Sequence, residues 1–125
     1  EVVRTSRAVL LLETSHPPTF YLPWSDVARH LLQPAAGGSV CEWKGPAKYW
    51  TLADGSRRLP KVAWSYPDPM PGAEPISDCV AFYAERLQCT VGGEAVRPQP
   101  GGVYGGWITP ELVGPFKGVV GSSGW

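Results

Sequence analysis

The chain has 125 residues, a length typical of one domain, and its eleven basic and eleven acidic side chains cancel to a formal net charge of zero. Zero net charge removes the electrostatic attraction that drives most binding to nucleic acids and anionic membranes, so we expect neither partner. The 15 glycines and 14 prolines predict much turn and irregular backbone, while six tryptophans and 43% hydrophobic residues predict a folded core.

The first part of the chain predicts short strands and one helix. The apolar run at residues 7–13 is typical of a largely buried strand, and residues 19–22 predict another short strand. A serine followed by aspartate, with apolar residues at helical spacing, predicts one helix of about two turns over residues 25–32. The two alanines and two glycines at residues 35–38 predict a loop.

A hairpin is the next predicted feature. Residues 39–43 and 48–53 are rich in strand-forming residues and predict neighbouring strands. Asp54-Gly55 lies between 48–53 and a further strand at 57–64, which predicts a type I′ turn with Asp54 and Gly55 at its centre. Pro60 lacks the N–H that a central strand needs, so this outgoing strand should lie at an edge or contain a bulge.

The second part of the chain predicts a loop and then more strands. Residues 65–75 hold four prolines and should form an extended surface loop. Residues 79–83 and 87–91 have strand character, and Gly92-Gly93 should turn the chain into a strand at 94–96.

The fold class follows from the number of these elements. The chain is predicted to have seven or eight short strands and only one short helix. These numbers predict a mainly β fold with two packed antiparallel sheets, as in a sandwich. We expect a single domain over residues 1–125, with a tail rich in glycine and proline at about 97–125. Trp107, Phe116 and Trp125 should anchor that tail.

Cysteine usage and hydropathy predict a soluble protein of the reducing cytoplasm. Cys41, Cys79 and Cys89 are sparse and form no C-x-x-C pair, so we expect no metal site, although one disulfide stays open as an alternative. No apolar run is long enough to span a membrane. Glu1 begins neither a signal peptide nor a chain with initiator methionine, which suggests that N-terminal residues are missing.

The densest group of aromatic residues lies in residues 41–50 and 63–67. Side chains alternate between the two faces of a strand, so Trp64 and Tyr66 should share one face, while Tyr49 and its neighbour point to opposite faces. These segments predict a recess with aromatic walls that binds a small polar or anionic molecule. We expect no cofactor. The alternative is that the same rings only pack the core. The predicted ligand-binding residues are His16, Trp43, Lys44, Tyr49, Trp64 and Tyr66.

His16 is the candidate for acid–base chemistry. It precedes two prolines that hold its loop rigid, and it could act with Glu13 or Lys44 as a catalytic acid–base pair. The alternative is a histidine whose ring only bonds to nearby backbone. The sequence contains no G-x-S-x-G motif, and the glycines at 101–106 match neither phosphate-binding loop pattern.

Five segments in order carry a resemblance to a known family. They are residues 12–23, 41–50, 63–67, 80–83 and 101–110, which read LETSHPPTFYLP, CEWKGPAKYW, AWSYP, VAFY and GGVYGGWITP. The chain thereby resembles the family called domain of unknown function 427. The resemblance implies a compact domain similar to the two-sheet β-tent folds, found in bacteria and fungi, without an established activity. It also implies a ligand recess between the sheets and a strand before Glu1.

The sequence departs from two properties associated with these relatives. Many β-tent proteins hold zinc with four cysteines, and three scattered cysteines cannot build that site. The family is sometimes labelled nucleotidyltransferase-like, which would require paired acidic residues to hold two metal ions. Asp26, Asp54, Asp68 and Asp78 are isolated from one another in sequence, so we do not expect that activity.

Three ligand-binding or catalytic functions remain open from the sequence, besides a purely structural or protein-interaction role for the proline-rich loop and the tail. The leading hypothesis is a small-molecule-binding domain that uses the aromatic recess. The second is an enzyme of unassigned reaction using His16 with Glu13 or Lys44. The third is a carbohydrate-binding module, which solvent exposure of Trp43 or Trp64 along a flat face would favour.

Overall fold

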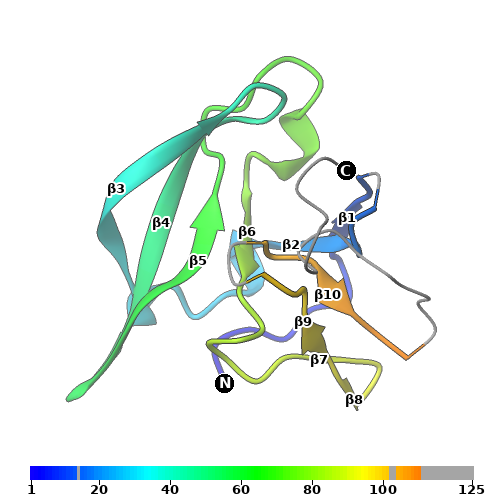
Figure 1. Cartoon of the computed structure of the whole chain (residues 1–125). Helices are drawn as coiled ribbons and strands as arrows, with labels where there is room; N and C mark the ends of the chain where they lie inside the picture. Colours follow the sequence, from blue (N-terminus) through cyan, green and yellow to red (C-terminus); the bar gives the residue numbers. More distant parts are fainter. Residues whose placement is uncertain (14, 102–103, 111–125) are drawn as a thin grey trace. The chain divides into compact units, whose positions relative to one another are not determined.

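A computed structural model describes residues 1–13, 15–101 and 104–110 (Figure 1). Within these residues the chain is mainly β, as predicted. The strands are β1 Val9–Leu11, β2 Thr19–Pro23, β3 Leu32–Cys41, β4 Gly45–Asp54, β5 Arg57–Ser65, β6 Cys79–Phe82, β7 Thr90–Val91, β8 Glu94–Ala95, β9 Arg97–Pro98 and β10 Trp107–Ile108. Single turns of 3-10 helix form η1 Trp24–Asp26, η2 Arg29–Leu31 and η3 Glu74–Ile76.

The strands form a six-stranded antiparallel sheet and two small two-stranded sheets. The large sheet has the order β1-β2-β6-β5-β4-β3, and the small sheets pair β9 with β10 and β7 with β8. The described chain divides into two compact units. The first unit combines Glu1–Val9 with Tyr21–Phe82, and the second combines Leu10–Phe20 with the described residues from Tyr83 onward.

The helix predicted at residues 25–32 is wrong. The segment forms η1 and η2, which are separated by Val27 in an extended conformation (φ −101°, ψ 138°). Val27 forms an antiparallel bridge with Val3, and the N–H of Ala28 donates to the carbonyl of Val2 at 2.6 Å. An isolated helix of two turns is unstable, so pairing with the N-terminal segment decides the backbone conformation here.

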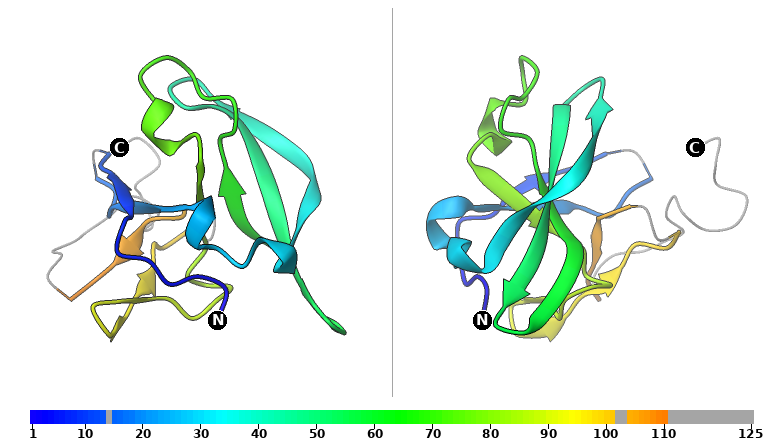
Figure 2. Two further views of the ribbon diagram at one scale, coloured as in Figure 1. Left: turned by 180° about the vertical axis from the view of Figure 1, so that it is seen from behind. Right: turned by 90° about the vertical axis from the view of Figure 1, so that its left-hand side faces the viewer.

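The loop predicted at residues 35–38 is also wrong, because these residues continue β3. Their pairing with β4 shifts between Pro34 and Gly38, which marks a β-bulge. Gly37 has φ +85°, a conformation that glycine adopts without steric cost. β3 is the edge strand of the large sheet, where a bulge disrupts the fewest hydrogen bonds. Figure 2 shows this strand, in cyan, running beside β4.

The hairpin between β4 and β5 is confirmed, but its turn is displaced by one residue. Asp54 pairs with Arg57, so the central residues are Gly55 and Ser56 rather than Asp54 and Gly55. Gly55 has φ +61°, and Ser56 has no positive φ. Glycine with positive φ at the first central position alone is the pattern of a type II′ turn, not of type I′.

Replacing Gly55 with valine is expected to lower the free energy of unfolding by about 1 kcal/mol or more, because β-branched residues avoid positive φ. A new Cβ would meet no atom within 4 Å, so backbone strain is the whole effect. Urea unfolding followed by circular dichroism measures it. Ser56→Val is the control and should have a smaller effect; equal losses would contradict the assigned turn.

Pro60 produces the predicted bulge inside β5. The pairing of β4 with β5 shifts between Trp50 and Leu52, and Lys61 has φ +51°. The Thr51 hydroxyl accepts a hydrogen bond from the N–H of Lys61 at 3.3 Å. The bulge therefore keeps a partner for this backbone donor, although β5 lies between β4 and β6.

The second part of the chain follows the prediction in outline. The proline-rich segment contains η3 and no strand, and β6 confirms the strand predicted at 79–83. The strand predicted at 87–91 is shorter, with only β7 paired. Trp107 is buried as expected of an anchor. Phe116 and Trp125 lie outside the described residues.

Candidate functional site

Aromatic side chains of β4 and β5 lie on opposite faces of the sheet. Tyr49 is directly opposite Trp64, and Trp50 is directly opposite Ala63. Residues opposite each other in an antiparallel pair place their side chains on the same face. The face of Tyr49 and Trp64 is called face A below, and the face of Trp50 is called face B.

The rings on face A form a packed group around Tyr21. The Tyr21 ring meets Trp64 edge-on, with centroids 6.4 Å apart, and lies 6.5 Å from the ring of Tyr66. These three side chains are only 1%, 7% and 7% exposed, respectively. Burial to this extent leaves little ring surface of Trp64 and Tyr66 open to solvent.

Tyr49 lies farther along face A and is half-buried. Its hydroxyl forms a hydrogen bond with the Ser39 hydroxyl at 2.9 Å. The Lys61 ammonium lies over its ring, 5.7 Å from the centroid. Tyr49 therefore joins the edge strand β3 to the bulge of β5.

Trp43 and Lys44 lie in the turn between β3 and β4. Trp43 is 79% exposed, whereas the Lys44 ammonium lies 5.7 Å from the centroid of the Tyr66 ring. The Lys44 carbonyl accepts a hydrogen bond from the N–H of Met70 at 3.0 Å. A Cβ on Gly45 would come within 2.9 Å of the Asp68 carbonyl oxygen, so glycine is needed for this close approach.

Exposed apolar residues lie in this turn and in the segments next to it. Val40 and Trp43 are each 79% exposed, and Met70 is 46% exposed. Val40 pairs with Pro46 next to the turn, and Met70 is bound to the carbonyl of Lys44. We call Trp43, Lys44 and Met70 the β3–β4 turn surface.

His16 belongs to the second unit, where a glutamine holds its imidazole. The Gln99 carboxamide oxygen accepts the N–H of Gly106 at 3.1 Å, so its NH₂ group is directed to His16 Nδ1 at 2.9 Å. Nδ1 is therefore the acceptor, and the proton of the neutral ring is on Nε2. The ring of Tyr104 packs edge-on against His16 with centroids 5.3 Å apart.

Two of the predicted acid–base residues, Glu13 and His16, contact each other in the second unit. Glu13 interacts with His16 through its main chain, because its carbonyl accepts the N–H of His16 at 3.0 Å. The side-chain partner of His16 is the neutral amide of Gln99. Glu13 and His16 belong to the second unit and Lys44 to the first.

The structure thus brings together part of the predicted set. Lys44, Tyr49, Trp64 and Tyr66 contact or neighbour one another through face A, and Trp43 precedes Lys44 in the turn. His16 has its own surroundings in the second unit.

An arginine–aspartate pair in the first unit was not predicted from the sequence. Arg7 donates to both carboxylate oxygens of Asp26, from Nη2 at 2.8 Å and from Nε at 3.2 Å, and Thr5 donates at 2.6 Å. The hydrogen bond from Arg7 is the main reason that the pKa of Asp26 lies below its ordinary value, and that from Thr5 is the next. The partners are 19 residues apart, so no local sequence pattern marks them.

The Asp26→Asn variant is expected to be less stable than the parent at pH 7, and by a smaller margin at about pH 2. A carboxyl with a lowered pKa in the folded state stabilises the fold above its unfolded pKa of about 3.9, and that contribution is lost as pH falls through the folded value. Urea unfolding at several pH values measures the difference, and Arg7→Gln should reproduce it. A difference of equal size at both pH values would contradict this explanation.

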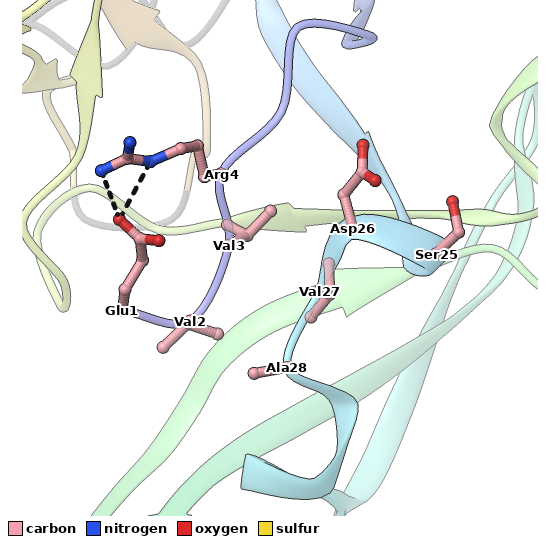
Figure 3. A pocket seen from close by; sticks show the side chains of 8 residues that line it. All are labelled: Glu1, Val2, Val3, Arg4, Ser25, Asp26, Val27 and Ala28. Carbon is pink, nitrogen blue, oxygen red and sulfur yellow. Dashed lines mark hydrogen bonds and ion pairs between the residues drawn. The ribbon is translucent and has the colours of Figure 1, made fainter.

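An open recess lies beside this pair (Figure 3). Its volume is about 370 Å³, and its lining residues are Glu1, Val2, Val3, Arg4, Ser25, Asp26, Val27 and Ala28. None of these residues is buried. Arg4 is paired with Glu1 at 3.0 Å and Asp26 with Arg7, so the charged groups of the recess already have partners.

The cysteines are unpaired thiols. Cys41, Cys79 and Cys89 are all free in the structure. Burial raises the pKa of Cys89 to about 11, and burial, followed by the charge of Asp78, raises the pKa of Cys79. These two thiols are protonated at neutral pH and are poor nucleophiles.

In ranges 1–13, 15–101 and 104–110, no group of three or more histidine, cysteine, aspartate or glutamate side chains is placed to hold a metal ion. No helix among these residues is long and apolar enough to cross a membrane.

Comparison with known proteins identifies the family. No curated protein matches the sequence. A family model described as a domain of unknown function (DUF427, short name NTP_transf_9) matches residues 1–93. This region contains every strand of the six-stranded sheet, whereas the motif at 101–110 lies beyond the match. Because the match spans most of the sequence, the chain belongs to the domain of unknown function 427 family.

Proposed function

We propose that the chain is a non-catalytic binding module that holds a small polar or anionic molecule at the β3–β4 turn surface. The observation that carries the proposal is Trp43, a tryptophan 79% exposed on a tight turn beside Lys44. Tryptophan is highly buried on average, so an exposed indole beside a cation is characteristic of a contact surface.

The turn is well suited to presenting this indole. Gly45 allows the proline-rich loop to approach the turn closely, and Met70 is hydrogen-bonded to Lys44. The Lys44 ammonium lies near the Tyr66 ring. Contacts that restrain the turn before binding reduce the entropy lost on binding.

The chemistry of the surface favours a planar or cyclic molecule with a negative charge. A ring can stack on the indole of Trp43, while Lys44 attracts a carboxylate or phosphate. Met70, whose N–H donates to the Lys44 carbonyl, adds exposed apolar area near the turn. This combination of apolar contact with few polar groups is typical of small-molecule sites.

Titrations of the protein with aromatic carboxylates, sugar acids and sugar phosphates test the proposal. Binding by the parent, Lys44→Ala and the controls can be followed through the indole N–H resonance of Trp43, and binding by Trp43→Ala through isothermal titration calorimetry. We expect saturable binding of at least one of these classes, which Trp43→Ala and Lys44→Ala each weaken about tenfold or more. Leu12→Ala and Arg57→Ala, which remove an exposed apolar group and a cation elsewhere, should leave binding unchanged. Absence of binding, or equal binding by all variants, would refute the proposal.

Exposure of Trp43 also favours a second candidate, binding of neutral carbohydrate. Sugar rings stack on exposed indoles, and such binding does not require a cation. In this case oligosaccharides should shift the Trp43 resonance, and Lys44→Ala should bind them as well as the parent does. Loss of oligosaccharide binding in Lys44→Ala would favour the anionic ligand instead.

A further inference from the structure

Two cations lie over two adjoining indoles on face B, the opposite side of the sheet from Trp64. The Arg29 guanidinium carbon is 4.4 Å from the centroid of Trp24, and the Lys48 ammonium is 4.7 Å from the centroid of Trp50. The two indoles meet edge-on with centroids 5.0 Å apart. Each cation therefore lies within 5.0 Å of the centroid of its own indole, and the two indoles are in contact with each other.

The indoles are held in place by the fold. Trp50 is 8% exposed, and its Nε1–H donates to the Ser65 hydroxyl at 2.9 Å. The main-chain N–H of Trp24 donates to the Asp78 carbonyl at 2.9 Å. The helical turn η1 precedes η2, and η2 leads directly into β3 (Figure 2). The rings thus form a fixed base for the two cationic side chains.

The cations have no acidic partner in the described part of the chain. Within the described residues, the Arg29 guanidinium interacts with the ring of Trp24, and the Lys48 ammonium interacts with the ring of Trp50. Arg4 and Arg7, in contrast, are each paired with a carboxylate. A guanidinium or ammonium over a ring still has N–H donors at its periphery, and these are available to an external acceptor.

We infer that Arg29 and Lys48 form a binding site for a small dianion, either a phosphate monoester or a dicarboxylate. Two cations without carboxylate partners create a local positive field on a chain whose net charge is zero. The guanidinium matches the geometry of carboxylate and phosphate oxygens, and the ammonium adds a second charge-assisted contact. The site does not depend on Trp43 or Lys44, because it uses different residues and the Lys44 ammonium lies near Tyr66 on face A.

Titration with methyl phosphate and, separately, with succinate tests this inference at constant ionic strength. Both probes carry two negative charges above neutral pH and have no ring to stack on Trp43. The indole N–H resonances of Trp24 and Trp50 are the readout. We expect saturable shifts with at least one probe, and about tenfold or greater weakening in both Arg29→Gln and Lys48→Gln. The probe that binds more tightly identifies the chemical class.

Controls separate this site from other effects. Lys61→Gln removes a lysine that lies over Tyr49 on face A, so it should bind the probes as the parent does. Trp43→Ala should also bind normally, which makes failure of this site distinguishable from failure of the proposed function. The inference is wrong if neither probe binds, if chloride of equal ionic strength gives the same shifts, or if Arg29→Gln and Lys48→Gln retain full affinity.

Discussion

Trp64→Ala is expected to lower the free energy of unfolding by about 3–5 kcal/mol, enough to unfold a domain of ordinary stability. Trp64 is 7% exposed and packs edge-on against Tyr21 on face A. Truncation would leave a cavity between β5 and its neighbours that the rest of the sheet cannot fill. Thermal and urea unfolding of the variant, followed by circular dichroism, measure the loss.

Trp43→Ala is the matched control for this prediction. The same side chain is removed, but Trp43 is 79% exposed, so the free energy of unfolding should change by less than about 0.5 kcal/mol. Equal destabilisation by the two substitutions would show that Trp43 is structural and would weaken its assignment to a binding surface. A stable Trp64→Ala variant would show that face A is not a packed core.

Gly106→Ala is expected to lower the free energy of unfolding by about 3 kcal/mol, at the upper end of the usual cost of overpacking. A Cβ at this position would lie 2.6 Å from Pro17 Cγ, 2.7 Å from Gln99 Oε1 and 2.7 Å from the Pro17 carbonyl oxygen. One of these contacts is with backbone, and Gln99 is held by its own hydrogen bonds. Neither neighbour can move away without breaking contacts around His16.

Urea unfolding of Gly106→Ala tests this result, with Gly93→Ala as the control. Gly93 has φ +83° but no atom within 4 Å of a new Cβ, so its substitution should cost only about 1 kcal/mol of backbone strain. The ¹⁵N resonances of His16 provide an independent readout, because displaced Gln99 would no longer hold Nδ1 as an acceptor. Equal effects of the two substitutions, with unchanged His16 resonances, would contradict the packing described here.

The contacts of His16 also bear on its chemistry. An imidazole that serves as a general base is usually oriented by a carboxylate, which stabilises the protonated ring. His16 instead accepts a hydrogen bond from the Gln99 amide, whose orientation is determined by Gly106. This arrangement fixes the imidazole between the Gln99 amide and the ring of Tyr104 in the second unit.

Local sequence signals determined the fold class and several elements. Short apolar runs separated by glycine and proline were sufficient to predict a mainly β chain. The strict alternation of side chains along a strand correctly placed Trp64 and Tyr66 on one face. Pro60 indicated the bulge of β5 because it lacks an N–H, and the glycine of Asp54-Gly55 located the hairpin to within one residue. These features depend on residues close together in the chain.

Only the tertiary structure decided the features that depend on distant partners. Residues 25–32 have a helical pattern, but pairing of Val27 with Val3 outweighs the weak stability of a short helix. Alternation predicts which face a side chain occupies, yet not whether another segment covers it, so it could not separate buried Trp64 from exposed Trp43. Gln99 meets His16 across 83 residues of sequence, and no local pattern encodes such a contact. Burial and pairing are properties of the assembled chain, because they require segments far apart in sequence to meet.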